Sequence, residues 1–307
     1  MDQFPGAPNT ALYVEAKTDG RPFFIVPWLG QYLIGTTDFA YDGPLDDIKA
    51  SNDEIDYLLA EVNRIFPNAS LARSDVRFTY SGVRPLPYSD GKSAGSITRR
   101  HILHTHEKVG IKNLISLIGG KLTTFRQVGE ELVDAVYRQR GERVPACPTH
   151  ATPLPGAIWG DDARLHQAIA DYGDRLSRLA LEHLFTLYGA RATEVLALTD
   201  TAPDLLEPLS PQLPDIGAQA VYAVETEMAH SITDILRRRT TIAMQDHYGF
   251  EAAPKVAAIL QRHCGWSSSA CDRSLQEYYA YLRDNCVPDY CVEELMAECM
   301  TVSAIAS

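Results

Sequence analysis

The chain has 307 residues; 45% are hydrophobic and 22% are charged, and 28 Lys and Arg against 40 Asp and Glu give a formal charge of −12. That composition is typical of a globular protein, and the length predicts two structural units. The acidic balance excludes general binding to a nucleic-acid backbone, which needs a basic surface. No apolar run approaches the roughly eighteen residues of a membrane span, and the amino terminus lacks a secretory signal. We therefore expect a cytoplasmic protein that contacts a membrane at most peripherally.

The six cysteines predict neither a disulfide framework nor a zinc site. None forms a CxxC pair, and none is spaced with histidines like a zinc ligand. We expect them to be reduced thiols that pack as small hydrophobic side chains. They are Cys147, Cys264, Cys271, Cys286, Cys291 and Cys299.

The first part of the chain predicts an antiparallel meander followed by a helix. Three short apolar or alternating runs are separated by turn signals at Asp19-Gly20 and Leu29-Gly30. Ser51 and Glu54 form a capping box, which predicts that a helix starts there, and Pro67 ends its pattern. The predicted strands cover 11–17, 22–28 and 31–37, and the apolar face of the helix runs from residue 55 to residue 66.

Alternation between apolar and polar residues over 76–81 predicts a half-buried strand that runs into Gly82-Val83-Arg84-Pro85. A surface loop over 87–96 and another strand over 97–106 follow. The segment 114–118 is nearly continuous apolar sequence, which predicts a strand buried on both faces. It ends at Gly119-Gly120 and passes into a helical pattern through residue 136, which indicates an α/β crossing point.

The second part of the chain predicts helices only. The segment 144–158 is rich in Pro, Thr and Ala and is the expected linker, and the second unit starts near Trp159. The segment 201–214 contains four prolines, so we expect at most an ordered loop there and no helix. The expected fold class is α+β, with an antiparallel sheet, one strand–helix unit of an α/β domain and an all-α domain over 159–307. The predicted helices cover 163–172, 175–188, 190–198, 218–230, 253–263 and 267–286.

The segment from Gly119 to Thr124 is the strongest local indication of a site. Two glycines after a strand allow a planar ligand to approach the backbone, and the following helix start and Lys121 favour an anion or an electron-rich carbonyl. An ordinary strand–helix turn, with Thr123 or Thr124 as N-cap, explains the same pattern. The pattern alone does not decide between these two interpretations.

Other charged residues allow two interpretations each. Arg84 and Arg99 flank one loop and could converge on a phosphate, or each could form a surface salt bridge. The histidine-rich strand places His104 and His106 on one face, but the sequence shows no further ligands for a metal, so we expect no metal site. The run Arg237-Arg238-Arg239 could touch an anionic lipid surface or neutralise the end of a helix.

Several motifs occur in an order that resembles a known family. In the first part they are Val26-Pro27-Trp28, Ile34-Gly35-Thr36-Thr37-Asp38, Tyr80-Ser81-Gly82-Val83-Arg84-Pro85-Leu86, Ile97-Thr98-Arg99 and Gly119-Gly120-Lys121-Leu122-Thr123-Thr124-Phe125-Arg126. In the helical part they are Glu227-Met228-Ala229, Asp234-Ile235-Leu236 and Arg238-Arg239-Thr240. Up to about residue 285 the chain resembles the FAD-dependent, aerobic (respiratory-chain) glycerol-3-phosphate dehydrogenases, flavoproteins of the wider group that includes the amino-acid oxidases.

The resemblance implies a function and a site. Residues 1–143 would form the substrate-binding sheet and the end of the FAD-binding domain. FAD would lie over Gly119, Gly120, Lys121, Leu122 and Thr123. Arg84, Arg99 and Lys121 would bind glycerol 3-phosphate, with Arg84 and Lys121 in the catalytic site. Hydride would pass from substrate C2 to the flavin, giving dihydroxyacetone phosphate, and a quinone would take the electrons. The resemblance is also compatible with a homodimer and with peripheral attachment to the inner face of the cytoplasmic membrane.

The sequence departs from this family at its start. It contains no GxGxxG, P-loop or HExxH motif, whereas the family begins with a strand–GxGxxG–helix unit and carries an active-site histidine upstream of the region matched here. We therefore expect that this polypeptide alone binds FAD weakly or not at all and lacks dehydrogenase activity. Two alternatives remain: a stand-alone helical interaction or binding module derived from such an enzyme, and a flavoenzyme resembling the amino-acid oxidases.

Overall fold

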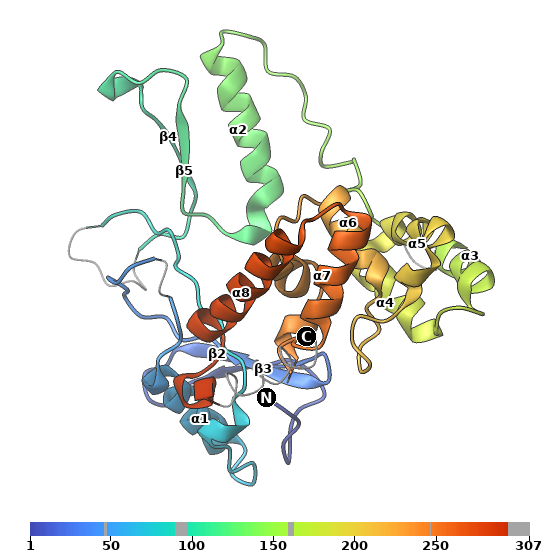
Figure 1. Ribbon diagram of the computed structural model, residues 1–307. Helices are drawn as coiled ribbons and strands as arrows, with labels where there is room; N and C mark the ends of the chain where they lie inside the picture. The colour runs from blue at the N-terminus through green and yellow to red at the C-terminus, as the bar shows by residue number, and fades with distance from the viewer. Residues whose placement is uncertain (46–47, 90–96, 159–162, 246, 294–307) are drawn as a thin grey trace. The chain divides into compact units, whose positions relative to one another are not determined.

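The computed structural model describes residues 1–45, 48–89, 97–158, 163–245 and 247–293 (Figure 1). The chain packs as two compact units, and each is described by itself. Unit 1 comprises Met1–Asp38, Pro44–Ser81 and Gly156–Ser307, and unit 2 comprises Phe39–Gly43 and Gly82–Pro155. Trp159, the predicted start of the helical domain, lies outside the described residues, and the division at a linker over 144–158 stays a prediction.

Unit 1 begins with the predicted antiparallel meander. Strands β1 (Leu12–Glu15), β2 (Pro22–Trp28) and β3 (Gln31–Gly35) lie in the order β1-β2-β3, and both pairings are antiparallel. At the β2–β3 turn, Leu29 and Gly30 both have positive φ, the backbone of the hairpin turn that matches strand twist. Alternation along β2 buries Phe23 and Ile25 on one face. The sequence therefore predicted this sheet correctly, although β1 and β3 are shorter than expected.

Helix α1 (Asn52–Ile65) covers the buried face of this sheet. Ser51 Oγ accepts a hydrogen bond from the backbone N–H of Glu54, and the Glu54 carboxylate accepts one from the backbone N–H of Ser51, which confirms the capping box. Ile55 and Val62 are buried on the face toward the sheet, and Val62 joins Phe23 and Ile25 in one hydrophobic cluster.

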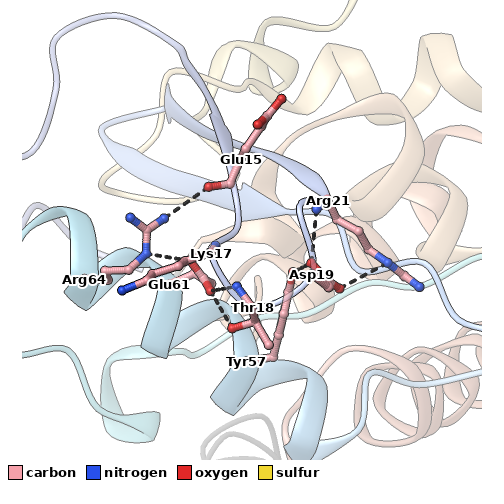
Figure 2. A network of polar contacts seen from close by, with 8 residues as sticks. All are labelled: Glu15, Lys17, Thr18, Asp19, Arg21, Tyr57, Glu61 and Arg64. Carbon is pink, nitrogen blue, oxygen red and sulfur yellow. Dashed lines mark hydrogen bonds and ion pairs between the residues drawn. The ribbon is translucent and has the colours of Figure 1, made fainter.

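A buried carboxylate fastens α1 to the turn between β1 and β2 (Figure 2). Glu61 is 3% exposed and accepts hydrogen bonds from Thr18 Oγ1 at 2.7 Å, from the backbone N–H groups of Lys17 and Thr18 at 3.0 and 3.1 Å, and from Arg64 Nε at 2.8 Å. Burial alone would raise the pKa of this carboxyl, but the hydrogen bonds from Thr18, Lys17 and Arg64 lower it to about 2. Sequence periodicity gave no indication of this contact, because Glu61 lies among apolar residues on the inner face of the helix.

The described residues of unit 1 from Ala163 onward are helical, as predicted, and their only described strand-like pairing is the isolated bridge between Pro208 and Ile216. None of the described helices is long and apolar enough to cross a bilayer. The α-helices are α3 (Ala163–Tyr172), α4 (Arg178–Tyr188), α5 (Ala192–Thr201), α6 (Gly217–Glu225), α7 (Ala252–His263) and α8 (Ser268–Asn285), and η7 (Asp234–Arg239) is a π-helix. Short 3₁₀ turns are η1 (Arg73–Asp75), η5 (Gly189–Arg191), η6 (Pro203–Leu206), η8 (Ile242–Met244) and η9 (Asp289–Cys291).

Helix α6 joins two hydrophobic clusters of the helical region. Its Ala220 and Ala223 pack with residues of η7, α7 and α8, including Leu236, whereas its Val221 packs with residues of α4 and α5, including Leu184. Accordingly α6 touches both α5 and α7, and in Figure 1 it lies beside α7. Apart from Gln219, the buried residues of α6 are mostly apolar, and its small alanines let the neighbouring helices approach.

The prediction that this helix continues to residue 230 is wrong. Helix α6 ends at Glu225, and Met228 has a left-handed backbone with φ of 60°. The backbone N–H of Ala229 donates to Ala223 O at 2.8 Å, a span wider than any regular helical turn. The chain therefore reverses here, although the apolar residues continue at helical spacing.

The predicted strand over 76–81 is also wrong. These residues have no regular secondary structure, because their backbone groups bond to the helical region instead of a neighbouring strand. The N–H of Thr79 donates to Cys286 O at 2.8 Å, and Tyr248 Oη donates to Arg77 O at 2.6 Å. The apolar alternation reflects burial of one side of an extended segment rather than strand pairing.

The described cysteines carry no disulfide. Cys271, Cys286 and Cys291 are buried in the core around α7 and α8, where burial raises the pKa of the Cys271 and Cys286 thiols. Cys299 lies outside the described residues.

The described residues of unit 2 form a two-stranded hairpin, one α-helix and short 3₁₀ turns. Strands β4 (Ile102–Thr105) and β5 (Ile115–Ile118) pair antiparallel across a loop that contains η3 (Glu107–Val109). The turn η4 (Leu122–Thr124) leads into α2 (Phe125–Gln139). β4 is shorter than the predicted strand over 97–106, and the loop predicted over 87–96 lies outside the described residues from 90 onward.

The expectation that 114–118 is buried on both faces is wrong for this structure. Among the described residues β5 pairs only with β4, and it is half-buried, with Leu117 exposed. Helix α2 buries only Val128 and leaves Phe125, Val133 and Val136 exposed. The apolar residues of β5 and α2 thus include several that the other residues of this unit leave exposed.

Candidate functional site

The diglycine turn follows β5 as predicted. Gly119 and Gly120 have φ of 70° and 94°, a region that other residues rarely adopt. A Cβ on Gly119 would lie 3.2 Å from Arg100 O, and one on Gly120 would lie 3.2 Å from His101 Cβ. Both glycines are therefore needed for the close approach of the segment that enters β4.

The start of the following helix agrees with one of the two threonine N-cap expectations in position, but not in hydrogen bonding. Thr124 occupies the N-cap position of α2, but its Oγ1 donates to Lys121 O at 2.8 Å and caps no N–H group. Thr123 lies within the 3₁₀ turn η4 and is exposed. Neither threonine side chain therefore acts as a hydrogen-bonding cap of α2.

Beside the turn lies an open hollow of about 710 Å³. It combines three cationic side chains with one carboxylate, so its surroundings favour an anion. Arg99 and Lys121, both predicted site residues, lie on this hollow. Its lining consists of Arg99, Arg100, His101, Leu103, Lys121, Thr124, Gln127 and Glu131.

Hydrogen bonds link residues of the wall formed by α2 to His101. His101 Nε2 lies 2.7 Å from Glu131 Oε2, and Gln127 Nε2 donates to Glu131 Oε1 at 2.8 Å. The hydrogen bond from His101, followed by that from Gln127, lowers the pKa of the Glu131 carboxyl. Glu131 therefore stays ionised at neutral pH and opposes only part of the positive charge.

Arg84 does not belong to the lining of this hollow. It is exposed in an extended loop, and its carbonyl accepts a hydrogen bond from Leu86 N–H at 2.8 Å. Of the three predicted substrate residues, the structure thus brings Arg99 and Lys121 to one hollow, and the place of Arg84 in the site stays a prediction.

The remaining candidates have structural partners. The rings of His104 and His106 meet edge to face at 4.7 Å, as expected for one face of a strand, and His106 Nε2 lies 2.8 Å from Ser116 Oγ. The described residues contain no group of three or more possible metal ligands. Arg238 pairs with Asp234 at 2.7 Å and Arg239 with Glu227 at 3.5 Å, and these contacts leave both interpretations of the arginine run as predictions.

Sequence reasoning missed the α2 wall of the hollow. Thr124, Gln127 and Glu131 follow one another at intervals of three and four, the spacing of one helix face. This polar stripe, set beside the diglycine turn, was the available signal. Arg100 and His101 gave none, because only the fold of β4 brings them to Lys121.

Comparisons with known proteins agree with this architecture. A profile for "FAD dependent oxidoreductase" matches residues 2–135, and a profile for the "C-terminal domain of alpha-glycerophosphate oxidase" matches residues 147–271. Both fold and profiles thus define the class as an FAD-dependent oxidoreductase.

Individual relatives identify a narrower family within this class. The chain is 59% identical over 293 residues to a glycerol-3-phosphate dehydrogenase of Synechocystis, covering 95% of this chain and 53% of the relative. It is 36% identical to D-erythritol 1-phosphate dehydrogenase of Brucella abortus, covering 74% of this chain and 45% of the relative. The crystal structure of glycerol-3-phosphate dehydrogenase from Bacillus halodurans complexed with FAD matches with a TM-score of 0.73 and 27% identity, over 90% of this chain and 54% of that one.

The chain belongs to the family of FAD-dependent glycerol-3-phosphate dehydrogenases. It spans about half the length of the curated relatives it matches.

Proposed function

We propose that this chain forms the substrate-binding and flavin-binding part of an FAD-dependent glycerol-3-phosphate dehydrogenase, which oxidises sn-glycerol 3-phosphate to dihydroxyacetone phosphate. The observation that carries the proposal is the hollow that Arg99 and Lys121 share beside the diglycine turn. A phosphate needs several cationic donors in one place, and this hollow offers them.

The residues of the turn suit a flavin. Leu122 is an apolar side chain with 89% of its surface exposed, next to the cationic Lys121, and the two glycines add no side-chain bulk. Such a surface fits a flat apolar ring whose edge gains negative charge. We assign cofactor binding to the turn from Gly119 through Thr123. When bound, FAD supplies the redox chemistry, accepting the hydride that leaves C2 of the substrate.

The side chains of this chain orient and polarise the substrate. Lys121 stabilises developing negative charge beside the turn, and Arg99 binds the phosphate end as a bidentate donor. Arg84 belongs to the same proposal as a second phosphate-binding arginine. Electron transfer to a quinone, a peripheral contact with the inner face of the cytoplasmic membrane and a homodimer rest on the family resemblance.

The domain division is part of the proposal. Residues 1–143 form the substrate-binding sheet and the end of the FAD-binding domain, 144–158 the linker and 159–307 the helical domain. The profile matches, which end at residue 135 and resume at residue 147, support a boundary in this region.

The test is Lys121→Met in a polypeptide that joins this chain to the part of the relatives that it does not match. We expect kcat/KM for sn-glycerol 3-phosphate to fall on the order of a hundredfold, because a charge that supports the transition state is lost. Lys108→Met is the matched control, since Lys108 lies in η3 of the same unit and outside the hollow. A Lys121→Met enzyme as active as this control would refute the proposal. Comparison with D-erythritol 1-phosphate tests which phosphorylated polyol the site prefers.

A further inference from the structure

Among the described residues that line the hollow beside the diglycine turn, Glu131 is the one carboxylate. It lies six residues after Phe125, where α2 begins, and a rise of about 1.5 Å per residue places it roughly 9 Å along the helix. Lys121, by contrast, lies before the helix begins. The lining therefore extends along α2 from a cationic residue to an anionic one.

Both oxygens of the Glu131 carboxylate have room for a further hydrogen-bond donor. Oε2 lies 2.7 Å from His101 Nε2, and Oε1 accepts a hydrogen bond from Gln127 Nε2 at 2.8 Å. A carboxylate oxygen can accept two hydrogen bonds, and each of these oxygens accepts one from the described residues. The Glu131 side chain is 41% exposed and lines the hollow, so a ligand that donates hydrogen bonds can reach it.

The ionised state of Glu131 restricts which atoms of a ligand it can contact. The hydrogen bond from His101, then that from Gln127 and the nearby charge of Arg100, lower the pKa of the carboxyl, although burial raises it. An ionised carboxylate repels a phosphate dianion and accepts hydrogen bonds from hydroxyl groups. Glu131 therefore suits a part of the ligand that carries hydroxyl groups and lies away from the phosphate.

Two cationic side chains of the same hollow are available to the phosphate. The ammonium group of Lys121 and the guanidinium of Arg100 form no hydrogen bond or ion pair with the described residues. The volume of about 710 Å³ lies within the roughly 300–1,000 Å³ of small-molecule sites. A phosphorylated polyol carries a dianion at one end and hydroxyl donors along the rest, so the hollow offers complementary groups to both of its parts.

We propose that Glu131 determines specificity for the hydroxyl end of the phosphorylated polyol, by accepting a hydrogen bond from the terminal hydroxyl of sn-glycerol 3-phosphate. This inference rests on the proposed function, in which the hollow binds the phosphate of that substrate through Arg99 and Lys121. A site that pairs with a substrate hydroxyl discriminates against an analogue that lacks it, because a charged acceptor is then left without its donor.

The test compares two substrates in the polypeptide that joins this chain to the part of the relatives that it does not match. One is sn-glycerol 3-phosphate, and the other is 2-hydroxypropyl phosphate of the same configuration, in which a methyl group replaces the terminal CH2OH. A hydrogen bond to a charged group contributes about a tenfold to a hundredfold effect, so kcat/KM of the parent should be lower by that factor for 2-hydroxypropyl phosphate. In Glu131→Met the two values should become similar, because the loss falls on sn-glycerol 3-phosphate. Glu131→Gln should keep part of the difference, since an amide oxygen still accepts a hydrogen bond.

Glu130→Met is the matched control. Glu130 precedes Glu131 on α2, pairs with Arg126 at 2.8 Å and lies outside the lining of the hollow, so its variant should keep the parent's preference. Inorganic phosphate, used as a competitive inhibitor, provides a second readout. Its inhibition should not weaken in Glu131→Met, because the cationic side chains stay in place.

Two results would overturn this inference. They are a parent enzyme that oxidises both substrates equally well, and a Glu131→Met enzyme that loses activity toward both in the same proportion, which would make Glu131 a structural partner of His101 only. Either result leaves the proposed function intact as long as Lys121→Met lowers kcat/KM. If Lys121→Met has no effect, the proposed function fails, and the role of Glu131 falls with it.

Discussion

At the scale of single residues, Glu61 shows how one carboxylate can join two elements. Four donors from the β1–β2 turn and from α1 surround it, and its side chain is almost fully buried (Figure 2). A buried charge is tolerated only with such complete hydrogen bonding. The charge of Glu61 should therefore contribute to the stability of unit 1.

We expect Glu61→Gln to destabilise unit 1, because an amide cannot replace a charge that accepts four hydrogen bonds. The loss near pH 7 should be on the order of 2–3 kcal/mol in urea unfolding. The folded pKa of about 2 lies below the ordinary value, so the stabilisation is fully present above the unfolded pKa of the carboxyl. It is lost as the pH falls from there through about 2. The parent should therefore lose stability more steeply than the variant over that range.

Glu182→Gln is the matched control for this measurement. Glu182 pairs with Arg178 on the surface of α4, and exposed pairs of this kind contribute less than about 1 kcal/mol. A Glu61→Gln protein with the same stability and pH dependence as Glu182→Gln would show that the buried network contributes no more than a surface pair.

At the scale of elements, the sequence predicted what local chemistry determines. The turn at Leu29-Gly30 and the capping box at Ser51 involve neighbours in the sequence, so their signals were readable and the structure confirms both. Glu61 acts on a segment that only the fold brings near, and sequence patterns carried no signal for it.

Failures of the sequence prediction have one cause, which is that burial and pairing partners are not encoded locally. The residues 76–81 alternate like a strand but bond to the helical region, and 114–118 is apolar like a buried strand but pairs only with β4 among the described residues. Part of the site was predictable because it is local. The glycines and Lys121 are adjacent in sequence, whereas the α2 wall of the hollow required knowledge of how α2 packs.

The diglycine turn and α2 allow a matched comparison between two glycines. Gly120→Ala should destabilise unit 2, because φ is 94° and the new Cβ would lie 3.2 Å from His101 Cβ. Gly129→Ala should stabilise it by about 0.5–1 kcal/mol, since Gly129 lies within α2 and a Cβ there meets no atom within 4 Å. Hydrogen exchange of the α2 amides at increasing temperature measures the stability of both variants. Equal effects of the two substitutions would mean that the turn does not require its left-handed backbone.

At the scale of the whole molecule, the two units differ in how much apolar surface they bury. Unit 1 holds three hydrophobic clusters, whereas α2 of unit 2 buries Val128 alone among its fifteen residues. Helix stability in proteins comes mainly from packing of an apolar face. Phe125, Val133 and Val136 of α2 are exposed, so this helix gains less from packing than the helices of unit 1 do.

Native-state hydrogen exchange of this chain should therefore reveal two levels of stability. Amides of α2, β4 and β5 should exchange faster than those of α6–α8, because segments with few buried apolar contacts open at lower free energy. Val128→Ala should accelerate exchange in α2 and leave α8 unchanged. Val256→Ala, which opens a cavity in the core around α7, should accelerate exchange in α8 and leave α2 unchanged. Equal protection of α2 and α8, lost together in both variants, would instead show that the two units unfold as one cooperative structure.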